Sequence, residues 1–156
     1  MNKFSIVIPV YNEAKNLQIL VPKIYKVLKN IKFELIIVDD NSRDDTSKIL
    51  KKFKKKNLHH LVRKKKRDLS KSCIDGFKKA KYKDIVVMDG DLQHKPSDLK
   101  KILNIFYKYN TDVVVGTRDL FTDKEHNLNF LRLFFIFIFN KLKKKLKKNI
   151  EINWIK

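Results

Sequence analysis

This sequence has few of the residues that cross-link or interrupt a chain. Its 156 residues include one cysteine, three glycines and three prolines. A single cysteine excludes an internal disulfide, and Cys73 lies on a predicted helix without an evident partner, which favours a small core residue over a nucleophile. No internal repeat or low-complexity linker divides the chain, and no apolar leader with small residues opens it. We therefore expect one compact domain in a reducing cytoplasm.

Acidic residues are also scarce relative to basic ones. The chain has 37 lysines and arginines against 17 aspartates and glutamates, which gives a formal net charge of +20. Such a surplus attracts phosphates, anionic lipid or nucleic acid. The simplest interpretation of lysine runs such as 51–52, 54–56 and 64–66 is solvated surface. The sequence disfavours nucleic acid as a partner, because no module that reads a groove is recognisable and acidic loops would face the nucleic-acid backbone.

No hydrophobic run is long enough to cross a membrane. Residues 128–139 are rich in aromatic and aliphatic side chains but are too short and too interrupted for a bilayer span, and a lysine-rich stretch follows over 140–148. We expect residues 126–156 to form an amphipathic basic helix in the same domain, which lies on anionic lipid headgroups, is buried in the protein or forms a subunit contact. On a membrane, each lysine would add attraction on the order of 1 kcal/mol. The expected location is cytoplasmic, peripheral at the inner face of the membrane.

Short apolar runs typical of strands alternate with longer stretches of helical spacing. Single helices between successive strands imply right-handed crossovers and a mainly parallel sheet covered on both faces, an α/β fold of three layers. In such sheets a ligand binds beyond the carboxyl ends of the strands. The predicted strands are Phe4–Pro9, Phe33–Asp39, Leu58–Arg63, Asp84–Asp89 and Asp112–Thr117, and the predicted helices are Glu13–Lys29, Asp44–Lys55, Ser70–Lys81 and Ser97–Tyr109.

Polar motifs follow four of these strands, at the edge where a ligand would bind. Asp89-Gly90-Asp91 lies at the carboxyl end of the fourth strand, directly after the apolar run 85–88, and its two carboxylates can hold one hard divalent cation together with a ligand's phosphates. Taken alone, such a motif is more often a capped strand-to-helix turn. A single nucleotide diphosphate, however, accounts for all four loops at once, so we favour a binding site there. The other motifs are Tyr11-Asn12-Glu13, Asp39-Asp40-Asn41-Ser42 and Gly116-Thr117-Arg118.

With these motifs in this order over residues 4–120, the chain resembles a family 2 glycosyltransferase of GT-A fold. It is most similar to the branch of dolichol- or polyprenyl-phosphate mannose and glucose synthases. The resemblance implies a Rossmann-like nucleotide-diphospho-sugar transferase core over residues 1–125. It also implies transfer, with inversion, of a hexose from a GDP- or UDP-sugar to a polyprenyl phosphate at the cytoplasmic membrane face. The segments that carry the resemblance are Val7–Glu13, Ile36–Thr46, Val87–Pro96 and Val115–Arg118.

The resemblance also implies roles for individual residues. A carboxylate can accept hydrogen bonds from a base or a ribose hydroxyl, and a tyrosine ring can pack on a base. Asp89, Asp91 and Gln93 would hold Mg²⁺ or Mn²⁺ against the pyrophosphate, with Asp91 among the catalytic residues. The residues implied in nucleotide-sugar binding are Pro9, Tyr11, Glu13, Asp39, Asp40, Asp89 and Gly90.

Two arginines match positions that look toward the donor or acceptor phosphate in the resembling synthases. These catalytic candidates are Arg118 and Arg132, because a planar guanidinium suits phosphate oxygens. A place on the surface of a helix, without a role in binding, accounts for Arg132 equally well. A helix cap is an alternative role for Asp40. The position of His94 suits closure of the loop before Pro96 better than it suits a metal ligand.

The chain departs from the resembled pattern in two places. Asp68 and Lys71 stand where many relatives have glycines near the donor, which would reshape that loop or add phosphate contacts. After Arg132, nothing matches the Asp-containing, Ser/Thr-Gly-Phe-like segment that helps form the acceptor side. Either a second copy or a complementing subunit supplies that part, or the chain is a weak or inactive domain that binds nucleotide or lipid. A phosphate acceptor is already ionised, so loss of a base matters less than loss of positioning.

Overall fold

The structure is a computed structural model that describes residues 3–116 and 136–139. All five predicted strands and all four predicted helices are present, with ends that differ by a few residues. Among the described residues, no helix is long and apolar enough to cross a membrane. In chain order the elements are β1 (Phe4–Val10), α1 (Ala14–Val27), β2 (Phe33–Asp39), α2 (Thr46–Lys52), β3 (Leu58–Val62), α3 (Leu69–Lys79), β4 (Asp84–Val87), α4 (Asp98–Tyr109), β5 (Val113–Gly116) and β6 (Ile136–Phe139).

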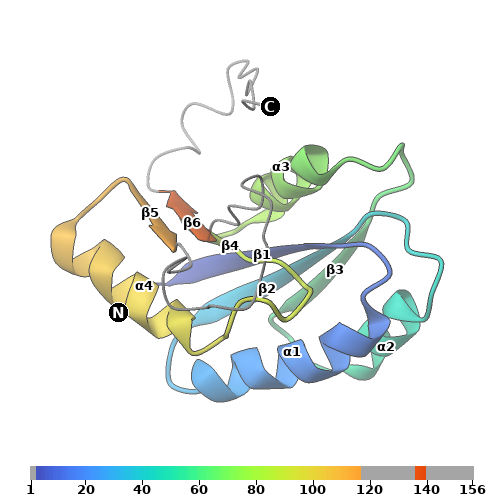
Figure 1. Cartoon of the computed structure of the whole chain (residues 1–156), viewed down its shortest axis with the longest axis horizontal. Helices are drawn as coiled ribbons and strands as arrows, with labels where there is room; N and C mark the ends of the chain where they lie inside the picture. The colour runs from blue at the N-terminus through green and yellow to red at the C-terminus, as the bar shows by residue number, and fades with distance from the viewer. Residues whose placement is uncertain (1–2, 117–135, 140–156) are drawn as a thin grey trace, which may run out of the picture.

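One six-stranded sheet, in the order β3-β2-β1-β4-β6-β5, forms the middle layer (Figure 1). Strands β1 to β4 run parallel, and Val7 of β1 pairs with Ile36 of β2 on one side and Val87 of β4 on the other. Strand β6 is antiparallel to both of its neighbours, so β5 runs in the same direction as β4. The sheet is therefore mainly parallel, as predicted, with one reversed strand.

The prediction of a helix over residues 126–156 is wrong for residues 136–139, which form strand β6. Ile138 pairs with Val86 of β4 and with Val114 of β5, so residues 136–139 are strand rather than helix. Isoleucine and phenylalanine both favour strands, and the partner strands on either side decide the outcome here. The rest of residues 126–156, including any membrane-surface helix, lies outside the described residues.

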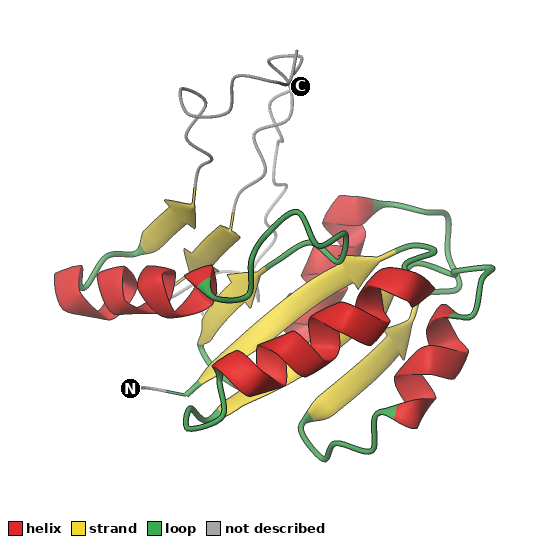
Figure 2. Ribbon diagram, turned by 60° about the horizontal axis from the view of Figure 1, so that its bottom comes forward, coloured by secondary structure: helices red, strands yellow, loops and turns green. Residues whose placement is uncertain are grey.

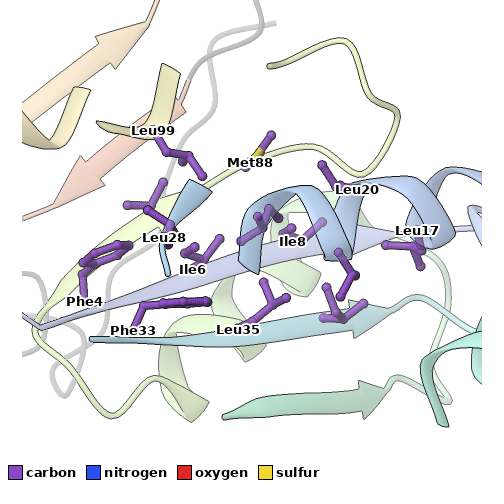
Figure 3. Packing of buried hydrophobic residues seen from close by; sticks show 14 of the residues in the cluster. Phe4, Ile6, Ile8, Leu17, Leu20, Leu28, Phe33, Leu35, Met88 and Leu99 are labelled. Atoms are coloured by element: carbon purple, nitrogen blue, oxygen red, sulfur yellow. The ribbon is translucent and has the colours of Figure 1, made fainter. Parts of the chain in front are cut away.

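Helix α1 packs on one face of the sheet (Figure 2). Strands β1 and β2 are buried along their whole length, which explains their continuous apolar runs. Ile6 and Ile8 of β1 and Leu35 of β2 form one cluster with Leu17 and Leu20 of α1 (Figure 3). Full burial of an aliphatic side chain of this size contributes about 1.5–3 kcal/mol. This packing fixes α1 on β1, and with it the loop that joins them.

Helix α3 covers the opposite face (Figure 2), where Phe77 and Ala80 pack against Val7 and Val38. Gly76 allows this close approach, because a Cβ there would lie 3.1 Å from Val38 Cγ2 and closer still to Val7. Helices on both faces of a mainly parallel sheet make the predicted three-layer α/β/α arrangement, so the predicted fold class is confirmed.

Candidate functional site

The carboxyl ends of β1 and β2 carry two loops that brace each other. The backbone N–H of Asn12 donates to Ser42 Oγ at 2.8 Å, and the N–H of Arg43 donates back to Asn12 Oδ1 at 2.8 Å. Asn12 and Asn41 both have left-handed backbones, with φ of 58° and 62°. Asparagine tolerates this conformation better than most residues, which suits it to both turns. The first two polar motifs therefore form one unit.

The loop after β2 also holds the start of α1. The N–H of Glu13 donates to Thr46 Oγ1 at 3.1 Å, and the N–H of Ala14 donates to Asp44 Oδ2 at 3.1 Å. Burial alone would raise the pKa of Asp44, but hydrogen bonds from Thr46 and Ala14 outweigh it and lower the pKa. Glu13 itself accepts from Asn16 Nδ2 at 2.6 Å. Sequence reasoning missed Asp44, because it is 30 positions from Ala14 and no local pattern links them.

Asp39, a predicted nucleoside contact, is fully buried at the end of β2. Its Oδ1 accepts from the N–H of Ser42 at 2.8 Å, and its Oδ2 lies 3.1 Å from Ser47 Oγ and 3.3 Å from His60 Nε2. Burial would raise the pKa of Asp39, but hydrogen bonds with these three residues outweigh burial and lower the pKa to about 2. Asp39 is therefore an ionised acceptor at neutral pH. Sequence reasoning did not single out His60, whose only signal is its place in a predicted strand.

Asp40 has a separate set of partners. One carboxylate oxygen accepts from Arg63 Nη1, and the other accepts from the N–H of Asp68 at 2.7 Å. Arg63 is also buried, and its Nε donates to Asp75 Oδ2 at 3.0 Å. Asp40 thus fastens the loop after β3 to the end of β2, and its carboxylate bonds to Arg63 and Asp68 rather than to the start of α2. The nucleoside contact of Asp40 stays a prediction, and Arg63 is another residue that sequence reasoning missed.

Asp68 stands at one of the positions where the resembled pattern has glycine. Its φ is −164°, an extended backbone that any residue adopts, so glycine is not needed here. The Asp68 side chain caps α3 by accepting from the N–H of Lys71 at 2.9 Å. The Nζ of Lys71 also lies 3.4 Å from Asp68 Oδ2 at the surface. In this structure the two residues stabilise the start of α3.

Asp89-Gly90-Asp91 lies against the loop after β1. Gly90 is buried, and a Cβ there would lie 2.8 Å from Val10 Cγ1 and 3.7 Å from Glu13 Cγ. Burial raises the pKa of the Asp89 carboxyl, and the negative charges of Asp91 and Glu13 raise it further. Burial and these two negative charges therefore outweigh the opposing effect of His94 at this point of the carboxyl edge.

A divalent cation fits this group of charges. In the described part of the chain, no set of three or more histidine, cysteine, aspartate or glutamate side chains is arranged to hold a metal. Two carboxylates, Asp89 and Asp91, suit Mg²⁺ or Mn²⁺, since Mg²⁺ in particular keeps other positions for phosphate oxygens and water. A bound cation would oppose the repulsion that raises the pKa of Asp89. Gln93, the third predicted ligand, is exposed in the same loop, and its N–H donates to Asp91 Oδ1 at 3.0 Å.

The other predicted residues lie partly inside and partly outside the described chain. Pro9 is buried within β1, and Tyr11 is half-buried directly after that strand. Arg118 and Arg132 lie outside the described residues. A hollow of about 620 Å³ adjoins the start of α1, but neither Tyr11 nor Asp89 lines it. Its lining residues are Asn12, Glu13, Ala14, Lys15, Asn16, Gln18, Asp44, Asp45 and Ile49.

Comparison with known proteins gives a family match over nearly the whole chain. The model of the family described as glycosyl transferase family 2 matches residues 5–155. The chain is 36% identical over 131 residues to a dolichol-phosphate mannosyltransferase of Pyrococcus furiosus, which covers 83% of this chain and 37% of that protein. It is 31% identical over 121 residues to the Saccharomyces cerevisiae protein of the same name, which covers 74% and 45%. The chain therefore spans less than half the length of these two relatives.

Solved structures agree with the fold. TarS 1–349 of S. aureus superposes with a TM-score of 0.60 at 26% identity and covers 72% of this chain and 34% of that chain. The mannosyltransferase PcManGT of Pyrobaculum calidifontis, solved with GDP-Man and Mn²⁺, superposes with a TM-score of 0.64 at 19% identity and covers 74% and 35%. At 19% identity, the second likeness shows the fold alone. The described sheet and helices have the GT-A fold.

Proposed function

Because the chain belongs to glycosyl transferase family 2, we propose that it is a hexosyltransferase that uses a GDP- or UDP-sugar donor and a polyprenyl phosphate acceptor such as dolichol phosphate. Its likeness to two dolichol-phosphate mannosyltransferases supports this acceptor class. The observation that carries the proposal is the packing of Asp89-Gly90-Asp91 against the loop after β1. Carboxylates at the carboxyl edge of a parallel sheet can bind a cation and a diphosphate together.

The donor nucleoside would lie over the ends of β1 and β2. Asp39 is ionised and has three hydrogen-bond partners, and because it is fully buried, a base or a ribose hydroxyl would reach its fourth acceptor position only after a neighbouring side chain moves. Tyr11 offers an aromatic ring against which a base can pack. Pro9, Glu13 and Asp40 complete the proposed surroundings of the nucleoside.

Transfer would join the acceptor phosphate to the sugar in one displacement. A phosphate oxygen attacks the anomeric carbon and forms the new C–O bond, while the bond from that carbon to the donor diphosphate breaks. The nucleoside diphosphate leaves with the electron pair, and attack from the opposite side inverts the configuration. Bound Mg²⁺ or Mn²⁺ at Asp89 and Asp91 would neutralise charge on the departing diphosphate. Arg118 and Arg132 are proposed to hold the reacting phosphates.

A polyprenyl phosphate would be met at a membrane. We place the protein in the cytoplasm, peripheral at the inner face of that membrane. The lysines of residues 140–148 would add attraction to anionic lipid on the order of 1 kcal/mol each. A second copy of this chain or a complementing subunit would complete the acceptor side.

Calorimetric titration with GDP, UDP and their hexose conjugates, with and without Mn²⁺, tests the donor site. We expect metal-dependent binding of one nucleotide and its loss in the double variant Asp89→Asn/Asp91→Asn. Asp112→Asn is a matched control, because this exposed aspartate precedes β5 at the opposite edge of the sheet. Normal metal-dependent binding in the double variant would reject the site.

Transfer itself is measured with a donor that carries a labelled hexose and with a polyprenyl phosphate in vesicles. Labelled lipid that forms with the wild type and disappears in Asp89→Asn/Asp91→Asn would support the transferase. Nucleotide binding without transfer would instead favour the alternative function, a catalytically inactive domain that serves as a nucleotide- or lipid-binding or assembly partner.

A further inference from the structure

Arg67 lies over the aromatic ring of Tyr11, with its Cζ 4.5 Å from the ring centroid. The contact joins two loops at the carboxyl edge, since Arg67 follows β3 and Tyr11 follows β1. Within the described residues, the guanidinium of Arg67 makes no hydrogen bond or ion pair. The planar face of the Arg67 guanidinium therefore packs on the Tyr11 ring, and its N–H groups are available to a ligand.

The loop that carries Arg67 is anchored at both ends. At one end, the buried side chain of Arg63 binds the carboxylate of Asp40. At the other end, the N–H of Asp68, the residue after Arg67, donates to Asp40 Oδ2 at 2.7 Å. Only the exposed lysines 64–66 lie between Arg63 and Arg67. A buried ion pair therefore restricts where Arg67 can lie.

The Arg67–Tyr11 pair stands between the two halves of the proposed donor site. Strand β1 ends just before Tyr11 and lies between β2 and β4 in the sheet. Asp39 ends β2, and Asp89 follows β4. A nucleotide sugar that reaches from Asp39 to Asp89 has to cross the end of β1, and its diphosphate would pass beside the Tyr11 ring.

The acidic residues along the path from Asp39 to Asp89 favour a cationic side chain beside the donor diphosphate. Asp89 and Asp91 flank Gly90, and Glu13 Cγ lies 3.7 Å from the place of a Cβ on that glycine, so three acidic residues already meet at this edge. A donor diphosphate adds more negative charge, which one divalent cation offsets only in part. When a guanidinium packs its planar face on a ring, the N–H groups at its edge can still donate to phosphate oxygens. The ammonium group of lysine has no such planar set of donors.

From these contacts we propose that Arg67 is a donor-binding residue whose guanidinium, positioned by Tyr11, hydrogen-bonds the diphosphate of the nucleotide sugar. The inference rests on the proposed function and adds to it a residue outside the four polar motifs. The ring of Tyr11 then orients a cation as well as a base.

Calorimetric titration with GDP and UDP in the presence of Mn²⁺ tests this role. We expect Arg67→Gln to weaken binding of the nucleotide that the wild type prefers by about tenfold or more, as for loss of a charge-assisted hydrogen bond. Arg67→Lys should lose several-fold, because lysine keeps the charge but not the planar fork. Lys66→Gln is the matched control: it removes one charge from the same exposed loop and should stay within about twofold.

Titration with the free nucleoside shows which part of the nucleotide Arg67 contacts. With guanosine or uridine in place of the diphosphate, Arg67→Gln and the wild type should bind alike. Equal losses for nucleoside and diphosphate would overturn the assignment and indicate stacking on the base. Tyr11→Leu should weaken binding of the nucleoside diphosphate. In the double variant Tyr11→Leu/Arg67→Gln, the loss of binding free energy should be smaller than the sum of the two single losses, because Tyr11 positions Arg67. Fully additive losses would contradict that positioning.

The outcomes separate this inference from the proposed function. If the wild type binds a nucleotide and Arg67→Gln behaves like Lys66→Gln, the role of Arg67 is wrong and the donor site stands. If the wild type binds neither GDP nor UDP, the proposed function fails and the role of Arg67 fails with it. Melting temperatures should be the same for Arg67→Gln and Lys66→Gln, since both residues are exposed, so a loss of binding would not reflect unfolding.

Discussion

Asp39 Oδ2 lies 3.3 Å from His60 Nε2, a contact between the neighbouring parallel strands β2 and β3. Asp39 is fully buried and also accepts hydrogen bonds from Ser42 and Ser47. Against burial, these contacts lower its pKa from 3.8 to about 2. The negative charge at the end of β2 is therefore stabilised by the fold itself, before any ligand arrives.

Acid should destabilise the protein through Asp39. Because the folded-state pKa is lowered, the unfolded chain takes up the proton first, near the ordinary pKa of 3.8. By linkage, the lowered pKa of Asp39 adds about 2 kcal/mol to the free energy of unfolding. This contribution is fully present above the unfolded-state pKa of 3.8 and is lost as the pH falls toward about 2. Urea unfolding at a series of pH values measures this. Asp39→Asn should have a shallower loss of unfolding free energy between about pH 4 and pH 2, and equal slopes for the two proteins would contradict the prediction.

Arg63→Met should destabilise the protein strongly, because it leaves the carboxylate of Asp40 buried without its cation. The side chains of Arg63 and Asp40 are only 3% and 5% exposed. Removal of one partner of a buried ion pair costs about 3–5 kcal/mol. Adding Asp40→Asn to Arg63→Met should restore part of this loss, since a neutral amide is easier to bury than a carboxylate. Unfolding free energies of the single and double variants check both statements, and a double variant less stable than Arg63→Met would count against them.

Gly90→Ala should lower stability and weaken nucleotide binding together. A Cβ at this position would lie 2.8 Å from Val10 Cγ1, so the side chain or the loop has to move. Overpacking of a buried position costs about 1–3 kcal/mol, and a moved loop would displace Asp89 and Asp91. Lys95→Ala, an exposed change in the same loop, should leave the melting temperature and the calorimetric titration as in the wild type. If Gly90→Ala melts at the wild-type temperature, the close contact does not matter for stability.

Cys73 should react slowly with thiol reagents while the protein is folded. Burial, together with the negative charges of Asp89 and Asp68, raises the pKa of its thiol to about 12. At about pH 8, almost none of it is the reactive thiolate. Labelling with a chromogenic disulfide reagent should be slow in buffer and fast in urea. Fast labelling of the folded protein would instead support the nucleophile that the sequence disfavours.

Local patterns were enough to predict the repeating part of the fold. The apolar runs of β1 and β2 are buried on both faces, and that signal depends only on residues close in the sequence. The same holds for the helical spacing of α1, whose buried residues include Leu17 and Leu20. Once a parallel sheet is predicted, its topology places the motifs that begin at Tyr11 and Asp89 at one edge.

Contacts between distant segments could not be predicted in this way. The bonds of Asp39 with His60 and of Asp40 with Arg63 join residues 21 and 23 positions apart, and only the observed strand order shows that they meet. Strand β6 escaped prediction for a related reason. A short run of isoleucine and phenylalanine suits a helix or a strand, and pairing with β4 and β5 decides between them.

Strand β6 is the last of the described strands to be synthesised, yet it lies inside the sheet, between β4 and β5. Until residues 136–139 leave the ribosome, β4 has an open edge and β5 lacks its only neighbour among the described strands. Pairing between segments so far apart in the chain is slow, and open strand edges invite association with other chains. Until then the nascent chain is vulnerable to aggregation through these strand edges, and the strand that leads into Asp89 gains its second neighbour only after residues 136–139 have been made.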